Sequence, residues 1–322
     1  MRVVILGATS HIAKGLIDRF LQRGGQQLCL FSRSPDNVRQ FLESIGQVQA
    51  EGVTICGDYR DFSDGCYDVI INSIGVETRN SHNCDFTRYF TVTEEFDNLS
   101  INYLKNHNPN ALYISFSSGA VYGRGFSEPV DEFSRNCLPV NQLQPEDYYG
   151  IVRIHAEAKH RAHPDLRIID LRIFSYFSRY INLTDGYFIT DVMEAILNDT
   201  LLITDSNNIV RDYLHPDDLF SMIVRCIQAG RINQAFDVSS ISPVSKREIL
   251  EYFTSEYGLR YESRRSSFNA SATGAKTNYY STCKQATRIG YMPRHSSMDS
   301  LKLESELILS RCQHSRKELV QI

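Results

Sequence analysis

The sequence lacks a long hydrophobic run and lacks clustered cysteines, and each absence argues against a class of protein. The longest apolar run near the N-terminus spans only residues 3–6, far less than a secretion signal or a membrane span needs. The eight cysteines form no CxxC pair and follow no regular spacing, so neither a zinc site nor a disulfide framework is predicted. We therefore expect a soluble, reduced, cytoplasmic protein.

An excess of charge of one sign is also missing. The formal net charge is −4, and the lysines and arginines are scattered along the chain. Proteins whose main partner is nucleic acid or an anionic membrane usually concentrate positive charge, so we expect neither partner. The length of 322 residues allows one large α/β domain with an appended lobe, or two interleaved lobes.

Short apolar runs alternate with helical patterns through the first half of the chain. The runs are residues 3–6, 28–31, 53–56, 69–74, 112–117 and 167–174. This alternation predicts an α/β fold of the Rossmann type, a doubly wound parallel sheet with helices on both faces. A later helix from Pro216 to near Gly230 and a strand over residues 235–238 extend the pattern. We expect residues 1–174 plus about 209–239 to form a dinucleotide-binding domain, and about 175–208 plus 240–322 a smaller, mainly C-terminal substrate-binding lobe.

The first strand runs directly into a tight turn and an amphipathic helix. A helix N-terminus in this arrangement presents free N–H groups to a phosphate. Gly7, Ser10 and Ala13 follow GxxGxxG spacing, although two of the three glycines are replaced. Ser10 either donates to a phosphate oxygen or crowds it, and a turn with no ligand is the alternative for the whole segment. The predicted cofactor contacts here are Gly7, Thr9, Ser10, His11 and Ile12.

The end of the second strand favours NADP over NAD. An NAD site usually has an acidic residue there for the ribose 2′-hydroxyl, whereas this chain has Ser32, Arg33 and Ser34. A guanidinium group flanked by hydroxyls suits a 2′-phosphate, and a solvated surface arginine is the alternative. The further predicted cofactor contacts follow the third and fourth strands and are Asp58, placed to accept from the adenine amino group, Tyr59, Asn72, Ser73 and Ile74.

Two segments about thirty residues apart predict a hydride-transfer site. Residues 117–123 read SSGAVYG at a strand end, and residues 149–153 read YGIVR at the start of a helix. A serine hydroxyl and a tyrosine phenol placed in this way can converge on one substrate oxygen, with the phenol acting as acid or base.

These segments, together with residues 57–61, 211–218 and 284–293, resemble the extended short-chain dehydrogenase/reductase family in order and spacing. That family comprises nucleotide-sugar epimerases, dehydratases and 4-keto-sugar reductases. The resemblance covers nearly the whole chain and implies that Ser118 and Tyr149 are catalytic. Arg153 stands where the family uses lysine to hold the nicotinamide ribose; an arginine keeps the charge but changes its shape.

The resemblance also implies a substrate site. Arg211 stands where relatives bind the diphosphate of a nucleotide sugar. Phe174 matches the segment beside the nicotinamide, and Ser175 and Tyr176 match positions that line the substrate, although the family commonly has asparagine in place of Ser175. Relatives often form homodimers through the helix of Tyr149 and the helix around residues 94–106, so a homodimer is expected.

The residues after Ser118 bear on the reaction. Dehydratases of this family carry an Asp-Glu pair where this chain has Gly119 and Ala120, which have no acid or base capacity, so dehydration is disfavoured. Arg33 favours exchangeable NADPH and hence reduction of a 4-keto sugar. The alternatives are an NAD-dependent nucleotide-sugar epimerase and a dinucleotide-sensing regulatory protein.

Histidine spacing does not predict a metal site. His155, His160 and His163 lie on or just after the helix of Tyr149, and their spacing is not that of HExxH. We expect solvated helix positions for them and no bound metal.

Overall fold

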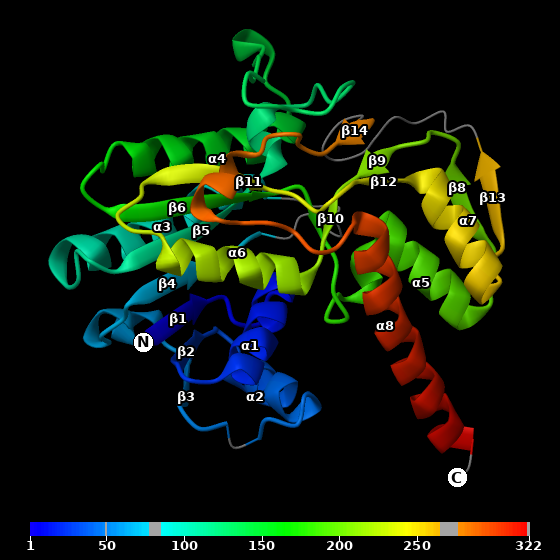
Figure 1. Ribbon diagram of the computed structural model, residues 1–322, viewed down its shortest axis with the longest axis horizontal. Helices are drawn as coiled ribbons and strands as arrows, with labels where there is room; N and C mark the ends of the chain where they lie inside the picture. Colours follow the sequence, from blue (N-terminus) through cyan, green and yellow to red (C-terminus); the bar gives the residue numbers. More distant parts are fainter. Residues whose placement is uncertain (49, 77–84, 265–275, 321–322) are drawn as a thin grey trace.

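A seven-stranded parallel sheet forms the centre of the larger part of the protein (Figure 1). The structure is a computed structural model and describes residues 1–48, 50–76, 85–264 and 276–320. The strand order is β11-β6-β5-β4-β1-β2-β3, and every neighbouring pair is parallel. The strands are β1 (Arg2–Leu6), β2 (Gln27–Phe31), β3 (Val53–Cys56), β4 (Val69–Asn72), β5 (Leu112–Ser118), β6 (Arg167–Ile173) and β11 (Gln234–Val238). The order reverses between β1 and β4, which is where open α/β sheets bind their ligands.

Both faces of the sheet are apolar, and helices cover both. Along β1, Val3 and Ile5 join one core cluster, whereas Val4 and Leu6 join another. Successive residues of a strand point to opposite faces, so a continuous apolar run must be covered on two sides. The helices around the sheet are α1 (His11–Arg23), α2 (Pro35–Ser44), α3 (Thr87–Asn106), α4 (Pro145–Arg161) and α6 (Pro216–Gln228). The doubly wound fold predicted from the sequence is confirmed.

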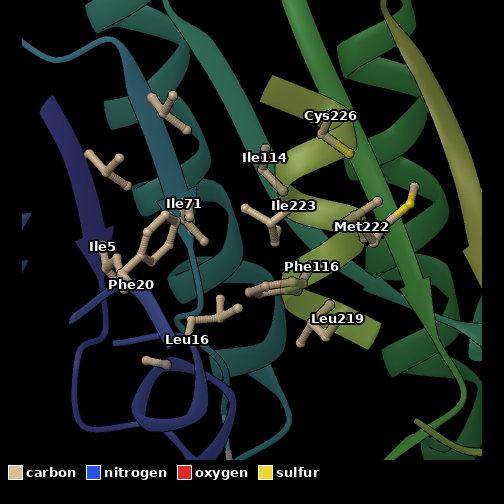
Figure 2. Close-up of a cluster of buried hydrophobic side chains, with 14 of the residues drawn as sticks. Ile5, Leu16, Phe20, Ile71, Ile114, Phe116, Leu219, Met222, Ile223 and Cys226 are labelled. Atoms are coloured by element: carbon tan, nitrogen blue, oxygen red, sulfur yellow. The ribbon is translucent and has the colours of Figure 1, made fainter. Parts of the chain in front are cut away.

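Figure 2 shows how α1 and α6 pack on one of these faces. Leu16 and Phe20 of α1, and Leu219 and Ile223 of α6, lie with strand residues such as Ile71 in one cluster of buried side chains. This packing fixes the direction of α1, whose N-terminus begins at the edge where the strands end.

The structure agrees with the predicted start of α6 at Pro216. Ser10 caps α1, which ends at Arg23 before Gly24, and Pro216 is the first residue of α6. β4 ends at Asn72, two residues earlier than predicted. The reason is local: the Asn72 side chain accepts a hydrogen bond from the Ile74 N–H at 3.1 Å and so turns the chain.

A separate apolar cluster lies in the C-terminal half. Residues such as Val192, Phe253 and Leu301 form it. It is enclosed by α5 (Phe188–Asn198), α7 (Lys246–Tyr257) and α8 (Ser297–Val320), beside the two-stranded sheet of β8 (Leu202–Asp205) and β13 (Tyr261–Arg264). The division into a cofactor domain and a substrate lobe remains a prediction that this second cluster supports.

Short strands connect the two halves. β7 (Ser175–Tyr176) pairs with β10 (Tyr213–Leu214), and β9 (Val210–Arg211) lies between β12 (Val244–Ser245) and β14 (Asn278–Tyr279). The 3-10 helices are η1 (Tyr59–Asp64), η2 (Gly119–Tyr122), η3 (Val140–Gln142), η4 (Leu183–Asp185) and η5 (Gln285–Ile289).

Candidate functional site

The turn between β1 and α1 is tight and depends on glycine. Gly7 has φ +75°, a conformation that side chains rarely adopt, and a Cβ there would lie 2.9 Å from Ile74. The Ser10 hydroxyl accepts a hydrogen bond from the Ala13 N–H at 3.2 Å and so caps α1. Thr9 and Ile12 are half-buried beside it. The geometry is that of a phosphate cradle, with the Ser10 oxygen already engaged by the helix.

The end of β4 is bound to this turn by side chains predicted to contact the cofactor. The Ser73 hydroxyl donates to the Leu6 carbonyl at 2.6 Å, and the Asn72 amide donates to the Tyr113 hydroxyl at 3.1 Å. Both side chains therefore hold neighbouring backbone and core groups in place. Asn72 and Ser73, together with Ile74 packed against Gly7, therefore lie at the point between β1 and β4 where the strand order reverses.

His11 and Tyr176 lie together against α1. The His11 Nε2 atom is 2.8 Å from the Ser178 hydroxyl, and burial lowers the pKa of His11 to about 4, so the ring is neutral. The ring of Tyr176 lies 4.8 Å from that of His11, and its hydroxyl packs against Gly15 of α1. The structure thus packs Tyr176 of β7 against α1, the helix of the predicted cofactor site, and brings His11 into contact with Ser178, just after β7.

Arg33 is exposed at the end of β2, and no hydrogen bond or ion pair engages it within the described residues. Ser32 is buried, and its hydroxyl accepts from the Ser34 N–H at 3.1 Å. The guanidinium group is therefore available to a ligand at the strand end, while the Ser32 oxygen helps to form the turn.

Asp58 and Tyr59 follow β3 and are already hydrogen-bonded. Two nitrogens of Arg60 donate to the Asp58 carboxylate, which lowers the pKa of Asp58 to about 2. The Tyr59 hydroxyl donates to the Phe31 carbonyl at 3.3 Å. An adenine amino group would share the Asp58 carboxylate with Arg60, a neighbour that the sequence analysis did not consider.

The helix of Tyr149 is attached to the end of β5 at two points. A Cβ on Gly150 would lie 2.5 Å from the Ala120 carbonyl oxygen, so only glycine lets α4 approach η2 this closely. The Arg153 Nη1 atom donates to the Phe116 carbonyl at 3.0 Å. These contacts hold the part of α4 that carries Tyr149 against the end of β5, the strand that carries Ser118.

Arg153 is held in a desolvated position beside the phenol. Its Cζ atom lies 5.0 Å from the centre of the Tyr149 ring. Burial by itself would lower the pKa of Arg153, but attraction to Tyr149 and a hydrogen bond with it outweigh burial and raise that pKa. The Nε atom is buried and has no hydrogen-bond partner among the residues that the structure describes. A buried donor without a partner is costly, and a ribose hydroxyl bound here would satisfy it. The residues therefore fit a dinucleotide.

Ser118 has an additional partner, which the sequence analysis did not identify. Its Oγ atom accepts from the Ala120 N–H at 3.2 Å and lies 3.0 Å from the Tyr279 hydroxyl. Tyr279 belongs to β14 and is paired in register with Arg211 of β9. The family-like segment 284–293 begins only five residues after Tyr279 and was the one signal in the sequence that pointed to this part of the chain.

Arg211 lies close to this tyrosine. Its guanidinium carbon is 5.7 Å from the centre of the Tyr279 ring, and its Nη1 atom donates to the Lys276 carbonyl at 2.7 Å. The Lys276 ammonium lies 4.2 Å from the same ring centre. Tyr279 thus contacts both residues: its hydroxyl lies beside Ser118, the predicted catalytic serine, and its ring lies beside Arg211, the predicted diphosphate-binding residue.

Aromatic rings and a small pocket border the site. The Phe174 ring lies 5.1 Å from that of Tyr279 and against Gly119, where a Cβ would collide with it. The pocket beside Tyr149 is lined in part by Ala120 and Lys276. Ser175 is half-buried in β7, directly after Phe174.

Ser117, the neighbour of Ser118 in β5, is held by a hydrogen bond to a buried ion pair. Its hydroxyl donates to the Glu157 carboxylate at 2.6 Å, and Arg172 pairs with the same carboxylate at 2.6 Å. Because Ser117 and Ser118 are adjacent, this buried ion pair holds the backbone that presents Ser118.

The prediction of solvated histidines on α4 is wrong for His160. Its side chain is fully buried, with Nδ1 2.8 Å from Asp170 and Nε2 2.5 Å from Asp97. The prediction rested only on histidine spacing that does not match a metal site, whereas two carboxylates pair with His160 inside the protein. His155 is exposed, as predicted, and His163 is half-buried.

One group of metal-ligand types occurs within the described residues, at His215, Asp217 and His295. The Asp217 carboxylate is paired with Arg19, and the His215 Nδ1 atom accepts from the Asp217 N–H at 3.1 Å. Two of the three side chains are therefore already engaged by contacts within the protein.

Comparisons with known proteins agree with this geometry. A family model described as the NAD dependent epimerase/dehydratase family matches residues 3–239. A search of curated proteins finds no relative. No helix among the described residues has the length and apolar character that a membrane crossing requires.

Solved structures with the same fold include UDP-sugar epimerases. A UDP-glucuronic acid 4-epimerase from Bacillus cereus, in complex with UDP-glucuronic acid and NAD, has a TM-score of 0.76 at 18% identity, covering 97% of this chain and 99% of that one. A UDP-glucose-4-epimerase from Stenotrophomonas maltophila with bound NAD has a TM-score of 0.79 at 18% identity and covers 98% and 99%. A UDP-N-acetylglucosamine 4-epimerase from Methanobrevibacter ruminantium M1 has a TM-score of 0.78 at 16% identity and covers 96% and 98%. At these identities the likeness shows the fold.

Proposed function

The chain belongs to the NAD-dependent epimerase/dehydratase family, and we propose that it is a dinucleotide-dependent 4-epimerase of a nucleotide-diphosphate sugar. UDP is the proposed nucleotide, because the structural neighbours bind UDP-sugars. The observation that carries the proposal is the placement of Tyr149, Ser118 and Arg153 around the end of β5.

Each of these side chains has a distinct task. Tyr149 takes the proton from the sugar C4 hydroxyl and returns it, and the Ser118 hydroxyl holds the same oxygen. Arg153 keeps a positive charge beside the phenol and offers its unpaired Nε atom to the ribose. The bound dinucleotide supplies the hydride acceptor and donor.

The steric surroundings of Ser118 argue against dehydration. The Phe174 ring fills the space that a side chain on Gly119 would need, and Ala120 follows with only a methyl group. No carboxylate is therefore supplied at these two positions to move protons at the neighbouring sugar carbons.

Reduction of a 4-keto sugar by NADPH is the second candidate, and Arg33 is the observation that favours it. Its exposed guanidinium at the end of β2 suits a 2′-phosphate. Epimerisation is preferred because the family description and the neighbours name NAD and epimerases.

We also propose a homodimer through α3 and α4, where Phe90 of α3 is 42% exposed.

The experiment incubates the purified protein with UDP-sugars in the presence of NAD, or of NADPH and a 4-keto sugar, and separates the products by chromatography. An epimerase interconverts the C4 epimers with no net change in cofactor, whereas a reductase consumes NADPH stoichiometrically. Tyr149→Phe should reduce either rate by about 100-fold or more, and Tyr148→Phe, one residue earlier on the same helix, is the matched control. If wild-type protein shows neither reaction, or if Tyr149→Phe retains full activity, the proposal is wrong.

A further inference from the structure

We propose that Tyr279 is a positioning residue that makes Ser118 a hydrogen-bond donor to the substrate, and this inference rests on the proposed function. The hydroxyl groups of Tyr279 and Ser118 are 3.0 Å apart, and both side chains are buried, at 8% exposure each. This contact joins β14, near the C-terminus, to the end of β5.

The number of hydrogen bonds that a hydroxyl can form supports this role. A serine hydroxyl has one proton and two acceptor lone pairs. The Ala120 N–H donates to the Ser118 oxygen and fills the first lone pair. When Tyr279 also donates, both lone pairs are filled, and the Ser118 proton is directed to a third partner. That partner is the oxygen on sugar C4.

The chemistry of the two hydroxyls indicates which of them donates. A phenol, with a pKa near 10, is a much stronger acid than a serine hydroxyl and is therefore the better donor. The Lys276 ammonium and the Arg211 guanidinium both face the Tyr279 ring, at 4.2 and 5.7 Å from its centre. Positive charges beside the ring draw electron density from the O–H bond and strengthen the donation.

The proposed reaction needs Ser118 as a donor. The C4 hydroxyl donates its proton to Tyr149, so its oxygen must accept from another group, and the developing carbonyl oxygen can only accept. If Ser118 instead donated to Tyr279, it would present a lone pair to that oxygen and repel it. By donating to Ser118, Tyr279 makes the Ser118 hydroxyl a hydrogen-bond donor to the C4 oxygen, as both directions of the reaction require.

The position of Tyr279 is also linked to the predicted diphosphate site. Tyr279 and Arg211 are register partners in parallel strands, and Arg211 donates to the Lys276 carbonyl at the start of the same segment. The ring is held by Phe126 and Phe174, at 4.7 and 5.1 Å between centres. A nucleotide sugar bound at Arg211 would therefore lie beside β14, the strand whose Tyr279 hydroxyl contacts Ser118.

The test uses Tyr279→Phe, which removes the hydroxyl and keeps the ring contacts, and Tyr280→Phe as the matched control in the same segment. We expect Tyr279→Phe to lower kcat about tenfold while the Kd for UDP stays within twofold, because the variant removes the hydroxyl that contacts Ser118 and keeps the ring beside Arg211. In a Ser118→Ala background, Tyr279→Phe should have no further effect, since a residue that acts through Ser118 has nothing left to act on. An equal loss in both backgrounds, or a loss of UDP affinity alone, would overturn the proposal.

A second measurement does not depend on turnover. Crystal structures of wild type and Tyr279→Phe should show one Ser118 rotamer in the wild type and a rotated or mixed Ser118 side chain in the variant. An unchanged single rotamer would contradict the proposal. A wild-type protein that binds UDP but converts no UDP-sugar would disprove the proposed function instead, and the crystal structures would still decide the role of Tyr279.

Discussion

The guanidinium group of Arg153 lies 5.0 Å from the centre of the Tyr149 ring and is tied to the Phe116 carbonyl on the strand that presents Ser118. One side chain therefore fixes the distance between helix α4 and strand β5 and also places a positive charge beside the phenol. A lysine at this position would supply the charge as a compact ammonium group, whereas arginine supplies it through a planar group with several donors.

Arg153→Ala should reduce kcat at least tenfold and weaken dinucleotide binding, because it removes both the charge beside Tyr149 and the Nε donor. Arg153→Lys should remain active, since it retains the charge. Steady-state kinetics and calorimetry measure these effects, with melting temperatures to detect misfolding. Activity in Arg153→Lys that the wild type lacks would mean that the natural chain is not an enzyme of this kind.

Arg33→Ala should weaken NADP binding by roughly 10 to 100-fold and leave NAD binding nearly unchanged, because charge-assisted hydrogen bonds to the 2′-phosphate contribute about 1.5–3 kcal/mol. Calorimetric titration with both cofactors measures the difference. Arg39→Ala is the matched control, since Arg39 is exposed on α2 and paired with Asp36. Equal losses for the two cofactors, or tighter NAD binding by wild type, would remove the preference for NADP.

Arg211→Ala should raise the KM for a nucleotide sugar and the Kd for UDP by about tenfold or more, with little change in dinucleotide affinity, because its positive charge is proposed to meet the diphosphate. Titration of UDP into the variant measures the loss. The exposed Arg247 provides a control, Arg247→Ala, on the neighbouring helix α7. A variant that binds UDP as tightly as wild type would exclude Arg211 from the substrate site.

The stability of the protein should depend on the protonation of His160. Burial opposes its charged form, but hydrogen bonds and charges from Asp170 and Asp97 outweigh burial and raise the pKa of His160 to about 9. The unfolded value is about 6.5. A raised pKa means that the stabilisation is fully present below about pH 6.5 and is lost as pH rises through about 9, by up to roughly 3 kcal/mol.

Urea unfolding between pH 6 and 10 measures this dependence. His160→Gln should lower stability at pH 6 and flatten its fall with pH, whereas the exposed His155→Gln should do neither. A wild-type free energy of unfolding that stays constant from pH 6.5 to 9 would show that His160 is not charged in the folded protein.

Local signals in the sequence were sufficient for much of the fold. The apolar run of β1 requires cover on both faces, Gly24 marks the end of α1, and Pro216 marks the start of α6. Each of these features depends on residues close together in the sequence, so the pattern of hydrophobic and capping residues is sufficient to predict the elements and their ends.

The sequence did not show how polar residues pair across the chain. His160 was predicted to be solvated because nothing within its own helix indicates the carboxylate of Asp97, 63 residues away, that helps to bury it. Asp58 was assigned to adenine without its local partner Arg60, since the sequence does not show the conformation of the turn.

The sequence by itself determined the doubly wound fold and its family, and it singled out Ser118, Tyr149 and Arg153 as candidate site residues, because order and spacing along the strands and helices carry that information. Only the tertiary structure decided that Tyr279 reaches Ser118 across 161 positions of sequence and that Arg211 lies beside the same ring. Such contacts depend on the register of the short strands β9 and β14, which pairs segments that no local pattern connects.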